Sequence, residues 1–243
     1  MPTMAEQSGI EAEPVRVKIC GITSVPALHA AIDAGANYIG LVFYPKSPRH
    51  LEIADAARIA DEARGRISIV SLLVDPDDET LTRILSAVRP DLIQLHGGET
   101  PARVAEIGAR FHLPVIKAVR VGQASDVEHA NGFTDIADII LFDAKPPKAY
   151  GTLPGGTGHT FDWRLIASWR GRPDFMLSGG LNPDNVQSAI DTTGATAIDV
   201  SSGVETAPGL KSPKLIQRFI SAARNVSAQA QSATWAEHRI SER

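Results

Sequence analysis

Reactive side chains and glycine-containing turns occur in a few short segments of this sequence. Cys20 is the single cysteine and could act as a thiolate, while Asp143 could carry a proton as a carboxyl group. Small residues let backbone N–H groups approach an anion closely. Two pairs of small residues therefore predict a phosphate site: Gly179 with Gly180, and Ser202 with Gly203. Together these residues indicate acid–base chemistry on a phosphorylated small molecule.

Each of these residues also has an ordinary structural interpretation. A lone cysteine is usually a buried packing residue, and an aspartate after a strand often caps a helix. A Gly-Gly pair often does no more than form a tight turn. The turns lack the lysine of a nucleotide-binding P-loop, so a nucleoside triphosphate is not indicated. The position of the residues in the fold must decide between the interpretations.

Three other side chains are candidates for a binding site. Arg49 carries a planar guanidinium that suits a carboxylate, although a surface charge is the default interpretation. His96 has no neighbour at metal-ligand spacing, and a structural role ranks above ring stacking or proton transfer. Asp199 either faces the same site or forms an ion pair with Lys18 across the floor of the fold.

The elements that would position these residues alternate regularly along the chain. Short runs rich in valine and isoleucine predict strands, and each is followed by a helix-like stretch. The spacing of the runs fits one strand, one loop and one crossover helix. The predicted strands are 15–20, 38–43, 67–74, 91–96, 114–119, 138–143, 174–179 and 197–202. Such units predict an all-parallel sheet.

Helix start signals support this division of the chain. A polar residue shortly before a proline marks four helix starts, at Ser24, Thr100, Asn182 and Ser212. The predicted helices are 26–35, 53–64, 78–88, 101–110, 125–132, 163–169, 183–192 and 212–224. An open doubly wound sheet could use the same units. Eight near-equal repeats without a dinucleotide glycine fingerprint favour a (β/α)₈ TIM barrel.

A barrel would bring the candidate residues together. The carboxyl ends of barrel strands form the active site, and strands 7 and 8 lie between the ends of strands 1 and 6. A phosphate held at strands 7 and 8 would place its sugar between Cys20 and Asp143. A lowered thiol pKa and a raised carboxyl pKa would help turnover at neutral pH. Lys18 near the thiol and partial burial of Asp143 are the expected causes.

Composition and charge limit the partners and the location. The 243 residues are 43% hydrophobic and carry a net charge of −4, which disfavours nucleic acid and anionic membranes. No signal-peptide pattern or membrane-length apolar run occurs, so we expect a cytoplasmic protein. One barrel domain is expected over 15–224, with extensions at 1–14 and 225–243. The proline- and glycine-rich segment after residue 144 predicts a loop over the mouth.

Seven segments, in this order, resemble the phosphoribosylanthranilate isomerase family of tryptophan biosynthesis. The similarity runs from about Val15 to Ala223. The segments are KICGIT from Lys18, GLVFYPKSPR from Gly40, QLHG from Gln94, FDAK from Phe142, GGTG with FDW from Gly155, LSGGL from Leu177 and DVSSGVE from Asp199.

The resemblance implies an Amadori rearrangement of N-(5-phosphoribosyl)anthranilate without a metal or organic cofactor. It implies that Cys20 is the general base, Asp143 the general acid and Arg49 the ligand of the anthranilate carboxylate. The family's phosphate turns map onto Gly179, Gly180, Ser202 and Gly203, and the family includes monomers and homodimers. Two alternatives stay open, namely another phosphosugar isomerase or epimerase barrel and a non-catalytic phosphosugar-binding barrel.

Overall fold

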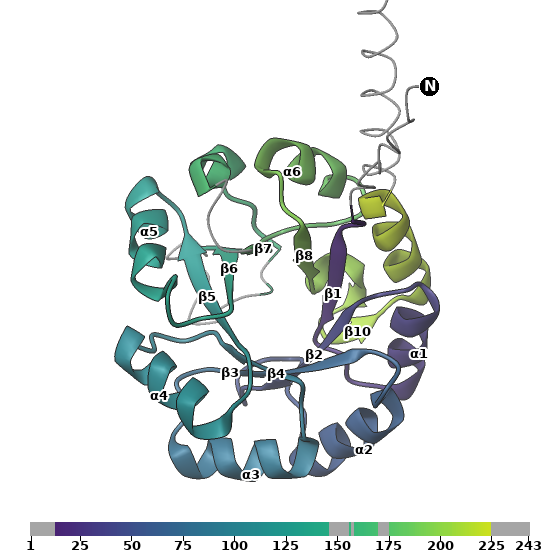
Figure 1. The fold of residues 1–243 in the computed structure, drawn as a ribbon. Helices are drawn as coiled ribbons and strands as arrows, with labels where there is room; N and C mark the ends of the chain where they lie inside the picture. The colour runs from purple at the N-terminus through teal and green to yellow at the C-terminus, as the bar shows by residue number, and fades with distance from the viewer. Residues whose placement is uncertain (1–12, 146–155, 157, 170–174, 225–243) are drawn as a thin grey trace, which may run out of the picture.

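Eight parallel strands close into a barrel in the computed structural model, which describes residues 13–145, 156, 158–169 and 175–224. Figure 1 looks along the barrel. The strands are β1 (Arg16–Cys20), β2 (Tyr38–Phe43), β3 (Ser68–Leu73), β4 (Leu92–Leu95), β5 (Val115–Val121), β6 (Ile139–Ala144), β7 (Phe175–Leu177) and β8 (Ala197–Val200). Because β8 pairs with β1, the sheet has no open edge, and the predicted barrel is confirmed over the open sheet.

Helices surround the barrel on its outside (Figure 1). The α-helices are α1 (Val25–Asp33), α2 (Ile53–Ala63), α3 (Asp78–Val88), α4 (Pro101–Phe111), α5 (Ala124–His129) and α6 (Val186–Thr193). Shorter 3₁₀ helices are η1 (Ala130–Phe133), η3 (Trp163–Trp169) and η4 (Ser202–Val204), and residues 213–224 form the last helix. None of the helices within the described residues has the length and apolar character needed to span a membrane.

Three of the four predicted helix starts are confirmed by their caps. The hydroxyl oxygens of Ser24, Thr100 and Ser212 each accept a hydrogen bond from the backbone N–H three residues later, at 3.3–3.4 Å. The start at Asn182 is wrong, because α6 begins only at Val186. The Asn182 side chain instead accepts from the N–H of Asn185 at 3.2 Å, and so closes a separate turn before the helix.

A two-stranded sheet follows the last barrel strand, and the sequence analysis did not predict it. Strands β9 (Glu205–Ala207) and β10 (Leu210–Lys211) pair antiparallel. They are too short for an alternating pattern to be seen. Gly209, with φ +81°, follows Pro208 in the connecting turn, and this Pro-Gly pair was the available signal. The hairpin lies beside the mouth end of β1.

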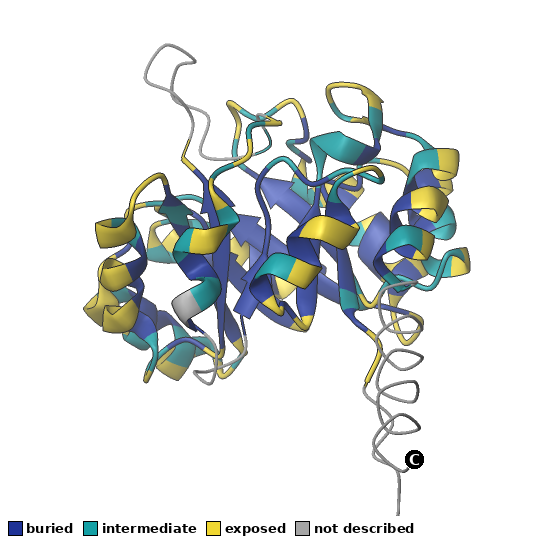
Figure 2. Cartoon of the chain, turned by 90° about the horizontal axis from the view of Figure 1, so that it is seen from above, coloured by how far each residue is buried: buried dark blue, intermediate teal, exposed yellow. Residues whose placement is uncertain are grey.

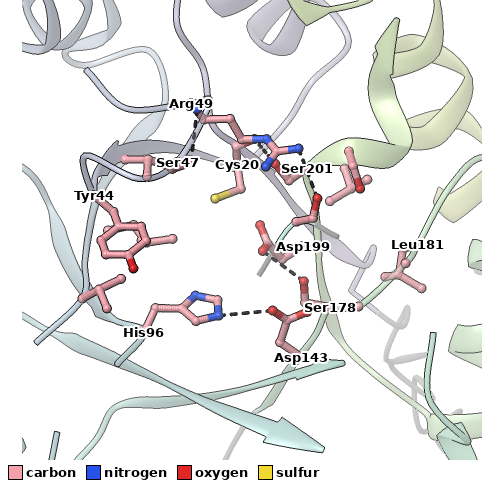
Figure 3. A pocket seen from close by; sticks show the side chains of 18 residues that line it. Cys20, Tyr44, Ser47, Arg49, His96, Asp143, Ser178, Leu181, Asp199 and Ser201 are labelled. Atoms are coloured by element: carbon pink, nitrogen blue, oxygen red, sulfur yellow. Dashed lines mark hydrogen bonds and ion pairs between the residues drawn. The ribbon is translucent and has the colours of Figure 1, made fainter. Parts of the chain in front are cut away.

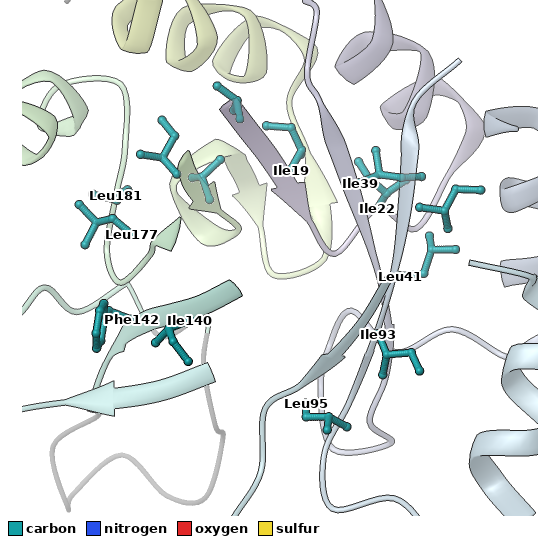
Figure 4. Packing of buried hydrophobic residues seen from close by; sticks show 14 of the residues in the cluster. Ile19, Ile22, Ile39, Leu41, Ile93, Leu95, Ile140, Phe142, Leu177 and Leu181 are labelled. Atoms are coloured by element: carbon teal, nitrogen blue, oxygen red, sulfur yellow. The ribbon is translucent and has the colours of Figure 1, made fainter. Parts of the chain in front are cut away.

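Alternate residues along each strand pack on opposite faces of the barrel wall. One set, which includes Ile19, Leu41 and Phe142, packs outward against the helices (Figure 4). The other set fills the interior, with Val70, Ile116 and Met176 among the residues of the lower layer. Figure 2 shows the buried strands inside a shell of helices whose outer faces are exposed. The upper interior layer contains Cys20, so the closed core leads directly to the mouth.

Two predictions about chain segments concern residues that the structure does not describe. The extensions at 1–14 and 225–243 lie outside the described residues, except for positions 13 and 14. The same holds for most of the predicted loop over the mouth, of which Lys145, Gly156 and the residues from Gly158 onward are described. These predictions remain expectations.

Candidate active site

One pocket at the carboxyl end of the barrel collects almost all of the predicted site residues (Figure 3). The predicted residues that line it are Cys20, Arg49, His96, Asp143, Gly179, Gly180, Asp199 and Ser202. Gly203 is not among the lining residues, since it packs against the backbone of Leu181. Ten residues of the pocket wall were not predicted as site residues, namely Val42, Tyr44, Ser47, Leu72, Val74, Gly156, Ser178, Leu181, Val200 and Ser201.

The turn after β7 requires both of its glycines. Gly179 has φ +89° and Gly180 has φ +63°, which place both residues in the left-handed region. A Cβ on Gly179 would also lie 2.6 Å from the backbone nitrogen of Ala144. No described residue accepts a hydrogen bond from the N–H of either glycine. The turn, with its close-packed backbone at the pocket wall, is therefore a candidate anion site.

A hydrogen-bonded chain of side chains supports Asp143 on one side of the pocket. The Asp143 carboxyl is 4% exposed, and its Oδ2 lies 3.1 Å from Nε2 of His96. Nδ1 of His96 lies 3.0 Å from Nε2 of Gln94, a buried residue of β4. With the Gln94 amide donating to Nδ1, the ring carries its hydrogen on Nε2 and donates it to Asp143. His96 is thus a polar neighbour of the predicted acid.

A buried ion pair lies beneath Cys20 on the other side. The Lys18 ammonium donates to Oδ1 of Asp199 at 2.9 Å, and the side chains are 0% and 5% exposed. Ser178 donates to the other carboxylate oxygen at 3.2 Å. Asp199 combines the two roles that were considered for it, since it pairs with Lys18 and also lines the pocket.

Burial raises the pKa of the Cys20 thiol above its ordinary value. The ammonium of Lys18 favours the thiolate, but Asp199 opposes this effect with its negative charge. Burial alone would lower the pKa of Lys18, but its charge and hydrogen-bond interactions with Asp199 and Cys20 together raise that pKa above its ordinary value. Lys18 therefore does not lower the pKa of this thiol below its ordinary value, as the sequence analysis considered, because burial outweighs its charge.

Alkylation of the single cysteine measures this directly. Because only the thiolate reacts, we expect the rate of alkylation of Cys20 by iodoacetamide to keep rising with pH beyond 9.0, the ordinary thiol value. Lys18→Met should shift the curve to still higher pH, because it removes the positive charge that favours the thiolate. Mass spectrometry after timed quenching gives the rates. A curve that levels off near pH 7 would contradict the raised pKa.

Gly40 on β2 makes room for the thiol. A Cβ at this position would lie 2.9 Å from the Cys20 sulfur and 3.2 Å from the Lys18 ammonium nitrogen. Gly40→Ala should therefore leave the barrel folded, since the φ of Gly40 is not positive, but displace the sulfur from the pocket. We expect kcat to fall about 10²-fold, in line with the sensitivity of catalysis to misplaced groups. Activity equal to wild type in a folded variant would show that the thiol position is not critical.

Arg49 reaches the pocket from the loop after β2 and is held from behind. Its Nε and Nη2 donate to the two carboxylate oxygens of Glu205, both at 2.8 Å, and Nη2 also donates to the carbonyl of Gly156 at 3.3 Å. Glu205 accepts a further hydrogen bond, of 2.6 Å, from the ammonium of Lys211. No described residue accepts from Nη1 of Arg49. Sequence reasoning missed the roles of Glu205 and Lys211.

A closed (β/α)₈ barrel with a thiol, a carboxyl and a glycine turn around one pocket at its carboxyl end places the protein among the TIM-barrel enzymes. Comparison with known families is specific. Residues 17–222 match the family model for N-(5'phosphoribosyl)anthranilate (PRA) isomerase. The chain belongs to this family.

Individual relatives agree with the family model. N-(5'-phosphoribosyl)anthranilate isomerase of Brucella canis is 51% identical over 213 residues, which cover 88% of this chain and 96% of the relative. The crystal structure of the Thermotoga maritima enzyme is 41% identical, with a TM-score of 0.78 over 87% of this chain and 99% of that chain. A related structure, of the isomerase in complex with reduced 1-(o-carboxyphenylamino)-1-deoxyribulose 5-phosphate, is 39% identical with a TM-score of 0.76 over 87% of this chain and 99% of that chain.

Proposed function

We propose that this chain converts N-(5'-phosphoribosyl)anthranilate to 1-(2-carboxyphenylamino)-1-deoxyribulose 5-phosphate in tryptophan biosynthesis, with Cys20 as general base and Asp143 as general acid. The observation that carries the proposal is the position of these two groups, on opposite sides of one pocket (Figure 3). The glycine turn after β7 lies between them in barrel order. A ribose whose phosphate binds at that turn meets the acid on one side and the base on the other.

The reaction begins at the ribose ring. Asp143 in its protonated form gives its proton to the ring oxygen as the C1–O bond breaks, which opens the ring and leaves an iminium ion. The Cys20 thiolate then takes the proton from C2 and gives an enolamine. Loss of the proton from the C2 hydroxyl and protonation of C1 give the ketone. Atoms balance, since substrate and product are isomers.

The raised thiol pKa fits this order of steps. Burial outweighs the attraction of Lys18 for the thiolate, so the uncharged thiol is favoured before a substrate reacts. The iminium formed by ring opening is a positive charge next to the sulfur, and an adjacent positive charge favours the thiolate. Cys20 would therefore release its own proton to the solvent once the iminium has formed, and the resulting thiolate would take the proton from C2. His96 donates to Asp143 and would hold the carboxylate that remains after proton transfer.

Arg49 would bind the anthranilate carboxylate through Nη1, while Glu205 occupies the other side of the guanidinium. The proposal needs neither a metal nor an organic cofactor. We extend it to a cytoplasmic enzyme that acts on a phosphoribosyl substrate, does not bind nucleic acid and is a monomer or homodimer. One structural relative is described as monomers generated from the dimeric phosphoribosylanthranilate isomerase of Thermotoga maritima.

Loss of substrate fluorescence tests the activity. The purified protein should remove the fluorescence of phosphoribosylanthranilate in a reaction that depends on enzyme concentration. A ribulose-phosphate epimerase, a histidine-pathway isomerase or a phosphosugar-binding barrel would leave the substrate intact. The reduced product analogue should inhibit the reaction by competing with the substrate. A folded protein that binds the analogue but leaves the substrate unchanged would support the non-catalytic alternative.

A further inference from the structure

A buried group of three charged side chains extends from the pocket wall into the protein behind it. Arg49, Glu205 and Lys211 have side chains that are 7%, 4% and 0% exposed. Only Arg49 of the three reaches the pocket wall. Glu205 and Lys211 lie on the β9–β10 hairpin and do not line the pocket.

The contacts within this group reach both the arginine and the base. Glu205 holds two of the three guanidinium nitrogens of Arg49, and Lys211 donates to the same carboxylate. Lys211 also donates to the carbonyl and hydroxyl oxygens of Ser201, at 3.0 and 3.2 Å. The Ser201 hydroxyl in turn donates to the carbonyl of Cys20 at 3.1 Å. One hairpin thus fixes the guanidinium and connects it with the end of β1.

The charges of the group have a consequence for binding. Two cations and one carboxylate leave a net charge of +1, which one carboxylate of a ligand balances. The planar guanidinium fork of Arg49 is held by Glu205 at Nε and Nη2, which fixes the direction of the third nitrogen, Nη1. A ligand carboxylate must therefore lie at one place to bind Nη1. Preorganisation of this kind reduces the entropic cost of ordering a long side chain on binding.

We infer that Glu205 and Lys211 are positioning residues that make the pocket selective for a ring with an ortho carboxylate. They act through Arg49, and the inference rests on the proposed function. The selectivity comes from the fixed direction of Nη1 and not from the amount of positive charge. Substitutions that keep the net charge but release the fork should therefore reduce the selectivity.

A binding experiment with two stable analogues tests this inference. The probes are reduced 1-(2-carboxyphenylamino)-1-deoxyribulose 5-phosphate and the same compound with an unsubstituted phenyl ring. The ratio of their dissociation constants, measured by calorimetry, isolates the contribution of the carboxylate. Wild type should bind the carboxylated analogue about 30-fold more tightly, the size expected for a charge-assisted hydrogen bond. Arg49→Met should reduce the ratio to near 1.

The decisive variant is Glu205→Gln combined with Lys211→Met, which removes one negative and one positive charge. The net charge beside Arg49 is unchanged, yet the ratio should fall about tenfold because the fork is released. Glu205→Asp keeps the charge but is one methylene shorter, and it should reduce the ratio about threefold. This milder variant provides the test if the double variant does not fold.

The Glu99–Lys117 pair supplies a matched control. It is equally buried and has the same length, 2.6 Å, but it lies outside the pocket. Glu99→Gln combined with Lys117→Met should lower the melting temperature and leave the ratio at the wild-type value. The inference would be overturned if the ratio of dissociation constants were unchanged in the Glu205 variants, or if it fell equally in the Glu99–Lys117 control. Either result would leave the proposed function standing. A wild type that does not distinguish the analogues would overturn the proposed role of Arg49 as well.

Discussion

Cys20→Ser should lower kcat about 10³-fold or more while the protein stays folded. Serine has nearly the same shape as cysteine, but its hydroxyl loses a proton far less readily than a thiol, so proton removal from C2 loses its base. The magnitude is within the range that a positioned general base contributes. The ion pair between Lys18 and Asp199 does not include the Cys20 side chain, so the substitution should leave that pair in place.

The control for this variant is binding. Cys20→Ser should bind the reduced product analogue with nearly the wild-type dissociation constant, because the phosphate turn and Arg49 are untouched. The steady-state rate of fluorescence loss gives kcat. If the variant turned over at the wild-type rate, Cys20 would be only a packing residue of the upper interior layer.

Asp143→Asn should lower kcat about 10³-fold, because the amide cannot deliver a proton to the ring oxygen. Asparagine has the same shape, and its single amide oxygen can accept one of the two hydrogen bonds that the carboxylate oxygens accept, from His96 or from the backbone N–H of Ala144. Neither contact involves the glycine turn after β7 or Arg49. The loss should therefore appear in kcat, with the affinity for the reduced product analogue nearly unchanged. Wild-type kcat in this variant would remove Asp143 from the mechanism and leave ring opening to another group.

A matched variant separates the acid from its neighbour. His96→Asn removes the ring that donates to Asp143 but leaves the carboxyl in place. It should reduce kcat less than Asp143→Asn does, by about tenfold, which is the size of one lost hydrogen bond to a charged group. An equal or larger loss in His96→Asn would assign the acid to the histidine.

Much of the barrel and of the acid–base pair could be predicted from sequence for a geometric reason. Side chains alternate along a strand, and closure of the barrel brings the ends of β1 and β6 to one mouth. The order of the apolar runs therefore placed Cys20 and Asp143 around one pocket. The glycines of the β7 turn were recognised for the same reason, since turns after adjacent strands must lie together.

Two features could not be predicted because they depend on long-range contacts. The pKa of Cys20 is raised by burial, and the negative charge of Asp199 opposes the effect of Lys18 on the thiol. Asp199 pairs with Lys18 although the two residues are 181 positions apart in the sequence. The hydrogen bonds that hold Arg49 depend on the short β9–β10 hairpin, which places Glu205 next to Arg49 although the two residues are 156 positions apart in the sequence. The predicted start of α6 was wrong for a local reason, because the Asn182 side chain closes a separate turn before the helix.

The carbon-13 spectrum of the product tests the central claim most directly. Substrate labelled with carbon-13 at C1 of the ribose is incubated with the wild-type protein, and the fate of that carbon is observed. An Amadori rearrangement predicts that the labelled ring CH becomes a CH₂ bonded to nitrogen, next to a new ketone at C2. A labelled carbon that remains an unchanged ring CH, whether after epimerisation elsewhere or after no reaction, would contradict the account.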